Sequence, residues 1–275
     1  MGFYDAFDKE HLIAAHRGWR AIRPENTLSA FEAAVGHCDF IELDIQLSRD
    51  GEWIVCHDES LERTTDVEER FPEGLRPRRV IDHTLAQLRR LDAGSWFVKR
   101  DPFGTLRSGE IRRREIESLP LQKLPTLREV LDFAREKQIP LNIEIKDMPI
   151  LGDREVVLRF LETYETTAGL PPILISSFNH HYLYRLHRYR PSLPLAALAE
   201  GCHPPRLLPY LQELGVEAYH VAEEIANSVP LDLLRAQGIA CGVYTVNDPK
   251  RQSDLYRRGF RTLFADDLFF DMLQN

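Results

Sequence analysis

Short apolar runs alternate with amphipathic segments along most of the chain. The apolar runs are short and rich in aliphatic side chains, which is typical of buried strands. The segments between them carry apolar residues three and four positions apart, the spacing of a helix that buries one face. The pattern predicts strands at Leu12–Ala15, Phe40–Leu47, Leu141–Lys146, Ile173–Ser177, Leu195–Ala199, Ala218–Val221, Cys241–Val246 and Thr262–Ala265.

Three of the intervening helices have a recognisable beginning. Asn26 is predicted as the N-cap of the first helix, because a short polar residue there can accept a bond from a free backbone N–H. Thr126 and Glu129 have the spacing of a capping box. Asp248 followed by Pro249 is typical of a helix start. Eight strands that alternate with helices predict an α/β protein, a single (β/α)8 TIM barrel over residues 1–275.

One stretch departs from this alternation. Asp50-Gly51 lies between two β-type runs, and this dipeptide is a strong signal for a two-residue hairpin turn. The run Trp53–Cys56 is therefore predicted to be antiparallel to the strand before it and not to belong to the barrel. We interpret residues 47–123 as an insertion between the second barrel strand and its helix.

Composition and charge limit the partners of this protein. The chain is 43% hydrophobic and 28% charged, as ordinary globular proteins are. Its formal net charge of −8 argues against nucleic-acid binding and against a basic membrane-binding face. The sequence shows no apolar run near the roughly 20 residues of a membrane span, and its first ten residues do not resemble a signal peptide. We therefore expect a cytoplasmic protein without stable membrane insertion.

Acidic residues gather on two strands that should be neighbours in the barrel. Glu42 and Asp44 are two positions apart and project to one side of their strand, as do Glu144 and Lys146 on the next. Converging carboxylates repel one another, so either their pKa values rise or a cation binds between them. Oxygen ligands favour Mg²⁺ or Ca²⁺ over zinc. The alternative is an edge of salt bridges with Arg or Lys partners.

Two histidines and two cationic side chains are expected beside the carboxylates. His16 and Arg17 follow the first strand, at the rim where barrel enzymes have their active sites. A two-residue turn in the hairpin would place His57 opposite Asp44. Two histidines suit a general acid and base, and Arg17 with Lys146 suits an anionic substrate. Together with a cation, this set indicates cleavage of phosphodiester bonds.

An ordered series of short motifs along nearly the whole chain resembles the glycerophosphodiester phosphodiesterase family. The motifs are His16-Arg17-Gly18, Pro24-Glu25-Asn26-Thr27, Ile41-Glu42-Leu43-Asp44, Asp50-Gly51, His57-Asp58, Leu61-Glu62-Arg63-Thr64-Thr65, Leu91-Asp92-Ala93-Gly94, Leu124-Pro125-Thr126-Leu127, Leu141-Asn142-Ile143-Glu144-Ile145-Lys146, Ser176-Ser177-Phe178 and Thr245-Val246-Asn247. The family is a barrel with an insertion after its second strand.

The resemblance implies hydrolysis of small glycerophosphodiesters to sn-glycerol 3-phosphate and an alcohol. It implies these roles: Mg²⁺ or Ca²⁺ held by Glu42, Asp44 and Glu144; His16 and His57 as the acid/base pair; Arg17 and Lys146 at the phosphate; Phe178 and Tyr244 near the glycerol. Three departures from the family pattern stand out. Tyr244 replaces a usual Trp, a Gly-rich stretch reads Asp66–Glu69, and a late motif reads Phe264–Asp266. The last two are expected to lie outside the site.

Two other functions fit the same architecture. A lysophospholipase D-type enzyme would need an apolar groove for an acyl chain, and Trp53, Trp96 and Phe97 of the insertion could form one. A catalytically silent barrel would bind phosphodiesters without turnover. The sequence does not indicate an oligomeric state.

Overall fold

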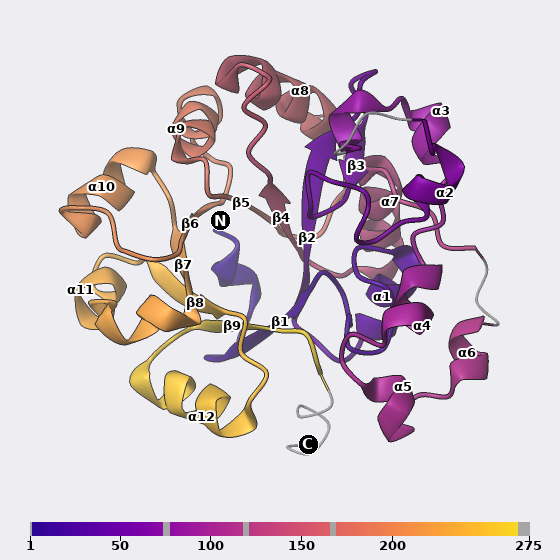
Figure 1. Ribbon diagram of the computed structural model, residues 1–275. Helices are drawn as coiled ribbons and strands as arrows, with labels where there is room; N and C mark the ends of the chain where they lie inside the picture. The colour runs from indigo at the N-terminus through magenta and orange to yellow at the C-terminus, as the bar shows by residue number, and fades with distance from the viewer. Residues whose placement is uncertain (1, 74–77, 118–120, 166–168, 269–275) are drawn as a thin grey trace.

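The computed structural model describes residues 2–73, 78–117, 121–165 and 169–268. Eight parallel strands close into a barrel in the order β1-β9-β8-β7-β6-β5-β4-β2, with β1 paired to β2 (Figure 1). The strands are β1 (Leu12–His16), β2 (Phe40–Leu47), β4 (Leu141–Ile145), β5 (Ile173–Ser177), β6 (Leu195–Ala199), β7 (Ala218–Ala222), β8 (Ala240–Tyr244) and β9 (Thr262–Ala265). The predicted (β/α)8 barrel is confirmed.

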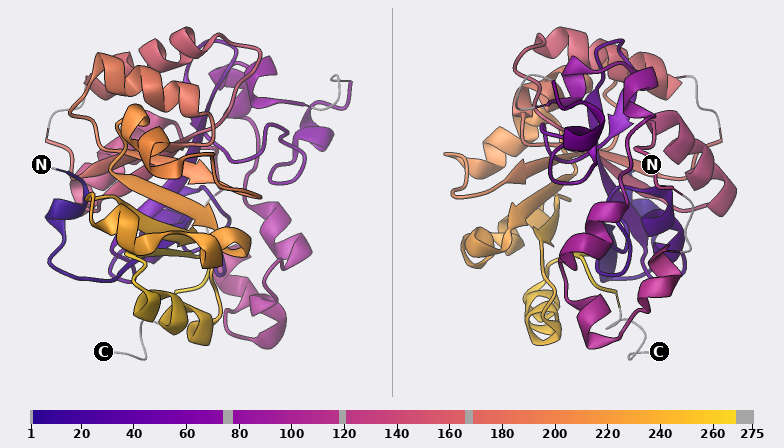
Figure 2. Two further views of the ribbon diagram at one scale, coloured as in Figure 1. Left: turned by 90° about the vertical axis from the view of Figure 1, so that its left-hand side faces the viewer. Right: turned by 45° about the vertical axis from the view of Figure 1, so that its right-hand side comes forward.

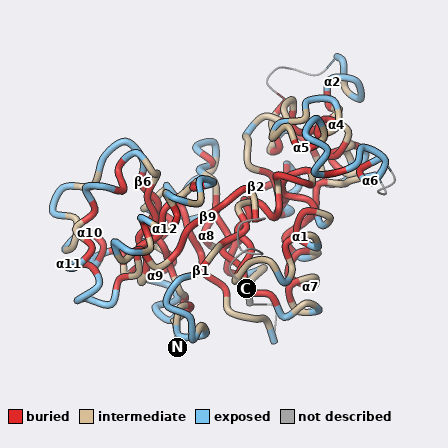
Figure 3. Tube along the Cα trace, turned by 90° about the horizontal axis from the view of Figure 1, so that it is seen from below, coloured by how far each residue is buried: buried red, intermediate tan, exposed pale blue. Residues whose placement is uncertain are grey.

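Helices surround the barrel and bury their apolar faces against the strands, so the buried residues form a continuous interior (Figures 2 and 3). These helices are α1 (Leu28–Ala34), α7 (Leu127–Lys137), α8 (Asp153–Glu165), α9 (His180–Tyr189), α10 (Leu207–Leu214), α11 (Leu231–Arg235) and α12 (Pro249–Arg258), with the 3-10 turn η3 (Glu223–Ser228) before α11.

Two of the three predicted helix starts are confirmed. Thr126 and Glu129 form the capping box of α7, and the Asp248 side chain accepts a bond from the backbone of α12. The third was wrong. Thr27 is the N-cap of α1, because its side chain accepts from the Ala30 N–H.

The hairpin after β2 is antiparallel, as predicted, but its register is not the predicted one. Ser48 N–H donates to the Glu52 carbonyl at 2.9 Å, so the turn has three residues and a φ of +85° at its glycine. Three-residue turns of this kind need a left-handed residue, which Gly supplies. The longer turn shifts the pairing by one residue, and the Cys56 N–H donates to the Asp44 carbonyl at 3.0 Å. The prediction that Asp44 lies opposite His57 was therefore wrong.

The segment between β2 and α7 forms a small lobe beside the barrel. It contains β3 (Trp53–Val55), α2 (Val67–Arg70), η2 (Val80–Asp82), α3 (Leu85–Leu88), α4 (Ser95–Arg100), α5 (Thr105–Ser108) and α6 (Arg113–Glu117). Part of it has its own apolar cluster, which includes Leu61, Val67 and Leu88. Figures 2 and 3 show most of this lobe toward one end of the barrel and the N-terminal segment at the other.

The N-terminal segment covers the end of the barrel opposite the lobe. The 3-10 turn η1 (Tyr4–Ala6) follows Phe3, whose side chain is 1% exposed and packs against Phe40 with ring centroids 5.1 Å apart. In the described part of the chain, no helix has both the length and the apolar character needed to cross a membrane.

Candidate active site

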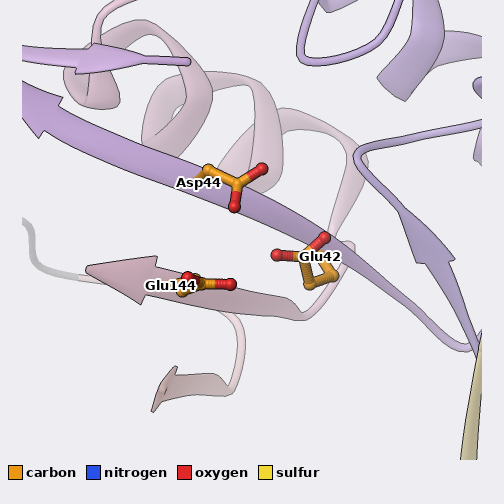
Figure 4. Close-up of side chains that lie close together, drawn as sticks. All are labelled: Glu42, Asp44 and Glu144. Atoms are coloured by element: carbon orange, nitrogen blue, oxygen red, sulfur yellow. The ribbon is translucent and has the colours of Figure 1, made fainter. Parts of the chain in front are cut away.

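The three predicted acidic ligands lie together inside the barrel mouth. Glu42 and Asp44 project from β2 and Glu144 from β4, and Asp44 pairs with Glu144 in the strand register (Figure 4). One oxygen of each carboxylate lies within 4.8 Å of those of the others, and all three residues are buried. Only oxygen atoms are offered at this point, which suits a hard divalent cation.

The pKa values of the three carboxylates reflect their burial and the charges close to them. Burial raises the pKa of Glu42 well above its usual range, and the neighbouring charges of Asp44 and Glu144 raise it further. Burial also raises the pKa of Glu144, although Lys146 partly offsets this. The pKa of Asp44 is lowered instead, because Arg17 and Lys146 outweigh its burial. A cation among the three would relieve this repulsion, so the residues present fit a metal site.

Two cationic side chains reach the triad. Lys146 Nζ lies 2.6 Å from a Glu144 oxygen and 3.5 Å from an Asp44 oxygen. Arg17 Nε lies 3.3 Å from the other Asp44 oxygen, and the Arg17 backbone N–H donates to Glu42 at 3.0 Å. The salt bridges considered from the sequence are thus present, and both cationic residues line a cavity together with two histidines.

The turn after β1 directs Arg17 toward the carboxylates. Arg17 and Gly18 both have left-handed backbones, with φ of 59° and 81°. A Cβ on Gly18 would lie 2.7 Å from the backbone carbon of Ala30, so this position requires glycine. Asn26, which was predicted as a helix cap, instead donates through its side-chain amide to Asp44 at 2.9 Å.

Both predicted catalytic histidines line the same cavity of about 390 Å³. The Nδ1 atom of His16 lies 2.7 Å from Asp266, and the Nδ1 atom of His57 lies 2.7 Å from Asp58. An Nδ1–H that donates to a carboxylate leaves Nε2 as the proton-accepting atom of a neutral ring. Burial, and next the charge of Arg17, lower the pKa of His16 and so favour the neutral ring.

The segment Phe264–Asp266 was expected outside the site, and this was wrong. Phe264 lines the cavity, and Asp266 bonds to His16. One signal could have found it. Asp266 directly follows the last barrel strand, so it lies on the same rim as the other site residues.

The remaining predicted substrate contacts form an aromatic wall of the cavity. The rings of Phe178 and Tyr244 lie edge to face with centroids 6.0 Å apart. Lys146 Nζ lies 5.8 Å from the Phe178 ring centroid, within the range of a cation–π contact. The Tyr244 hydroxyl donates to the Ala199 carbonyl at 2.8 Å, which fixes the ring. Burial raises the pKa of Tyr244, so its hydroxyl remains neutral.

The three aromatic residues of the lobe that were considered for an acyl-chain groove do not form one. Trp53, Trp96 and Phe97 are 3%, 6% and 0% exposed and belong to the main hydrophobic core. None of them lines the cavity around the triad. The expectation that they supply an apolar groove was therefore wrong.

Comparison with known proteins gives one family. The model of the Glycerophosphoryl diester phosphodiesterase family matches residues 16–268, which include every site residue described above. A glycerophosphodiester phosphodiesterase of Caldanaerobacter subterraneus subsp. tengcongensis is 31% identical over 93% of this chain and 94% of its own length. A glycerophosphodiester phosphodiesterase of Bacillus subtilis is 32% identical over 94% of this chain and 85% of its own length.

Solved structures share the fold. A phosphodiesterase of Oleispira antarctica, in complex with the product sn-glycerol-3-phosphate, superposes with a TM-score of 0.79. The alignment covers 100% of this chain and 98% of that one at 24% identity.

Proposed function

The chain belongs to the glycerophosphoryl diester phosphodiesterase family, and from this we propose that it hydrolyses small glycerophosphodiesters to sn-glycerol 3-phosphate and an alcohol. One observation carries the proposal. Glu42 and Glu144 of the carboxylate triad line a single cavity together with two histidines, each of which is oriented by its own acidic partner. The complex of the Oleispira antarctica phosphodiesterase with sn-glycerol-3-phosphate supports the proposed product class.

Glu42, Asp44 and Glu144 would hold a divalent cation, Mg²⁺ or Ca²⁺. When bound, such a cation would supply electrostatic stabilisation of the charge that develops on the phosphate oxygens. Arg17 and Lys146 add fixed positive charge for the same phosphate.

The histidines move the protons of the reaction. In our proposal one imidazole accepts the proton of the attacking hydroxyl as its oxygen bonds to phosphorus. The other begins the step as an imidazolium, with protons on both Nδ1 and Nε2, and gives its Nε2 proton to the leaving oxygen as the ester P–O bond breaks. His16 and His57 fill these two roles, and their acidic partners stabilise whichever ring becomes charged. Phe178 and Tyr244 would pack against the carbon skeleton of the glycerol.

The first test measures release of glycerol 3-phosphate from glycerophosphocholine, with and without a chelator. We expect release that the chelator abolishes and an added divalent cation restores. Glu42→Gln and Glu144→Gln should each lower kcat by about 10²-fold or more, because each removes one charged ligand of the cation. Glu59→Gln, at an exposed glutamate of the lobe, serves as the control and should leave kcat unchanged.

The outcomes of this test separate the alternatives. Full activity in the presence of chelator would contradict the metal assignment. Binding of glycerophosphocholine without release of product would indicate the catalytically silent barrel. Because Trp53, Trp96 and Phe97 are buried, we expect lysophosphatidylcholine to be a poorer substrate than glycerophosphocholine. The reverse preference would favour the lysophospholipase D-type activity.

A further inference from the structure

His57 is connected to Glu25, in the loop between β1 and α1, through a series of charged side chains. Its Nδ1 atom bonds to Asp58, and Arg63 donates through Nη2 to the same Asp58 oxygen at 3.0 Å and through Nε to the other. Arg63 also donates through Nη1 and Nη2 to the two oxygens of Glu25, at 2.9 and 2.7 Å. All three nitrogens of one guanidinium are thus engaged with two carboxylates. Such bidentate contacts fix direction as well as distance.

Glu25 is a rigid anchor for this chain. It is 5% exposed and also accepts bonds from Arg17 at 2.9 Å and Arg20 at 2.8 Å. Burial acts to raise its pKa, but Arg63 and the other two guanidinium groups outweigh this and lower it to about 2. The Arg63 guanidinium carbon lies 6.0 Å from the ring centroid of the buried Trp96. Glu25 is therefore held by three guanidinium groups, and Arg63, which joins it to the lobe, also packs against Trp96 of the lobe.

The Asp58 carboxylate, at the other end of this series of contacts, would be poorly held without Arg63. The side chain of Asp58 is 26% exposed, and the described residues that bond to its carboxylate are His57 and Arg63 alone. His57 precedes Asp58 directly in the chain, in a stretch without helix or strand. Gln46 holds the backbone of this stretch, because its Nε2 donates to the His57 and Asp58 carbonyls at 3.2 and 2.7 Å, but it does not hold the Asp58 carboxylate. If the Asp58 carboxylate rotated, its hydrogen bond to His57 Nδ1 would break and the imidazole could turn.

We propose that Arg63 is a positioning residue for His57: it fastens the Asp58 carboxylate to Glu25 and so fixes the tautomer and the direction of the imidazole. The inference rests on the proposed function, in which His57 is one member of the acid/base pair. Outer contacts of this kind typically change activity by about 10- to 100-fold.

Arg89 offers a matched control. Like Arg63 it belongs to the lobe and bonds to a glutamate of the barrel, Glu129 on α7. The two arginine side chains are equally exposed, at 32% for Arg89 and 33% for Arg63. Arg89 has no contact with either histidine in the described residues. A general cross-link between lobe and barrel is therefore lost in both Arg63→Met and Arg89→Met, whereas the support of His57 is lost only in the first.

The experiment compares the two variants with the parent protein in three measurements. These are kcat and KM for glycerophosphocholine, the melting temperature, and the histidine tautomers by nitrogen-15 NMR of the imidazole rings. We expect Arg63→Met to lower kcat by about 10- to 100-fold with KM changed by less than about threefold. Its His57 signal should change from the Nδ1–H form to a mixture of both tautomers. Arg89→Met should keep the parent kcat and tautomer.

Two further arms make the result decisive. Arg63→Lys keeps the charge but lacks the planar guanidinium that bonds to two carboxylates at once, so it should fold and still lose more than half of kcat. Guanidinium ion added to Arg63→Ala should restore part of the lost kcat. Equal kcat losses in Arg63→Met and Arg89→Met, or a single Nδ1–H tautomer in Arg63→Lys together with full kcat, would overturn the proposal. Absence of turnover in the parent protein would instead contradict the proposed function. The tautomer measurement would still test whether Arg63 positions His57 through Asp58.

Discussion

At the residue scale, each cavity histidine donates through Nδ1 to a carboxylate that lies farther from the triad. Asp266 does this for His16 from 250 positions away in the sequence, and Asp58 does it for His57, its direct neighbour. A carboxylate in this place fixes the tautomer and stabilises the imidazolium that forms during proton transfer. Both histidines are thus oriented by a hydrogen bond from Nδ1 to an aspartate, but the two aspartates come from different segments of the chain.

Replacing Asp266 by Asn tests this hydrogen bond for His16. The amide can donate to Nδ1 and so favour the tautomer that carries its proton on Nε2, the wrong form for accepting one. We expect Asp266→Asn to lower kcat by about 10²-fold or more, as measured by release of glycerol 3-phosphate at pH 7.

The neighbouring residue provides the control. Asp267 accepts a bond from the Trp19 indole at 3.2 Å and does not contact His16, so Asp267→Asn should retain kcat within about twofold. If both variants kept the parent kcat, the role of Asp266 would be purely structural.

At this scale the sequence could supply some contacts and not others. The alternation of a strand is enough to place Glu42 and Asp44 on one side. The hydrogen bond between His16 and Asp266 joins residues 250 positions apart in the sequence, and no local sequence pattern predicts a contact at that separation. Asn26 has the residue type of a helix cap, yet its amide is engaged with Asp44 while Thr27 caps the helix. Residue type alone does not choose between adjacent candidates.

At the scale of elements, strand positions were predictable and the turn was not. Four of the eight barrel strands have the predicted bounds, because apolar runs end where the chain leaves the barrel wall. Asp-Gly is compatible with turns of two or three residues, and the difference shifts the register by one. His57 nevertheless lines the cavity, because it lies beyond the paired part of the hairpin, where the chain turns back toward the barrel.

The N-terminal turn η1 gives a prediction at this scale. Phe3 lies in an apolar cluster at the closed end of the barrel with Leu12, Phe40 and Phe264. Truncating a fully buried Phe leaves a cavity, so Phe3→Ala should lower the free energy of unfolding by about 3–5 kcal/mol. Urea unfolding measures this loss.

Activity and a surface variant serve as controls for that loss. Since Phe3 does not line the active-site cavity, folded Phe3→Ala should keep kcat within about twofold. Leu233→Ala, at a side chain that is 49% exposed, should change the free energy of unfolding by about 0.5 kcal/mol or less. A Phe3→Ala protein as stable as Leu233→Ala would show that the segment does not support the barrel.

At the scale of the whole molecule, the two ends of the barrel have different tasks. One end gathers crowded charged groups around the carboxylate triad, while the other is closed by apolar packing. His220 lies between them, fully buried on β7, with its ring 4.8 Å from that of Phe264 and its Nε2 atom 2.9 Å from the Tyr4 hydroxyl. A Cβ on Gly242 of β8 would lie 2.8 Å from the His220 ring, so the glycine makes room for it.

His220 makes the stability of the whole fold depend on pH. Burial lowers its pKa to about 3, whereas in the unfolded chain it titrates near the ordinary value of about 6.5. Above pH 6.5 both states are neutral there, and the residue adds no pH dependence. Between pH 6.5 and 3 only the unfolded state binds the proton, so the native state loses stability as the pH falls. From pH 7 to pH 5 this amounts to about 2 kcal/mol.

The variant His220→Gln isolates this contribution. Glutamine does not titrate and can still accept a bond from Tyr4, so any loss of packing is the same at both pH values. We expect the decrease in unfolding free energy between pH 7 and pH 5, measured with urea, to be smaller in His220→Gln than in the parent by about 2 kcal/mol. The carboxylates and other histidines titrate alike in both proteins and cancel in the comparison. Equal decreases would mean that His220 can be protonated in the folded barrel, which its burial beside Phe264 and Tyr4 opposes.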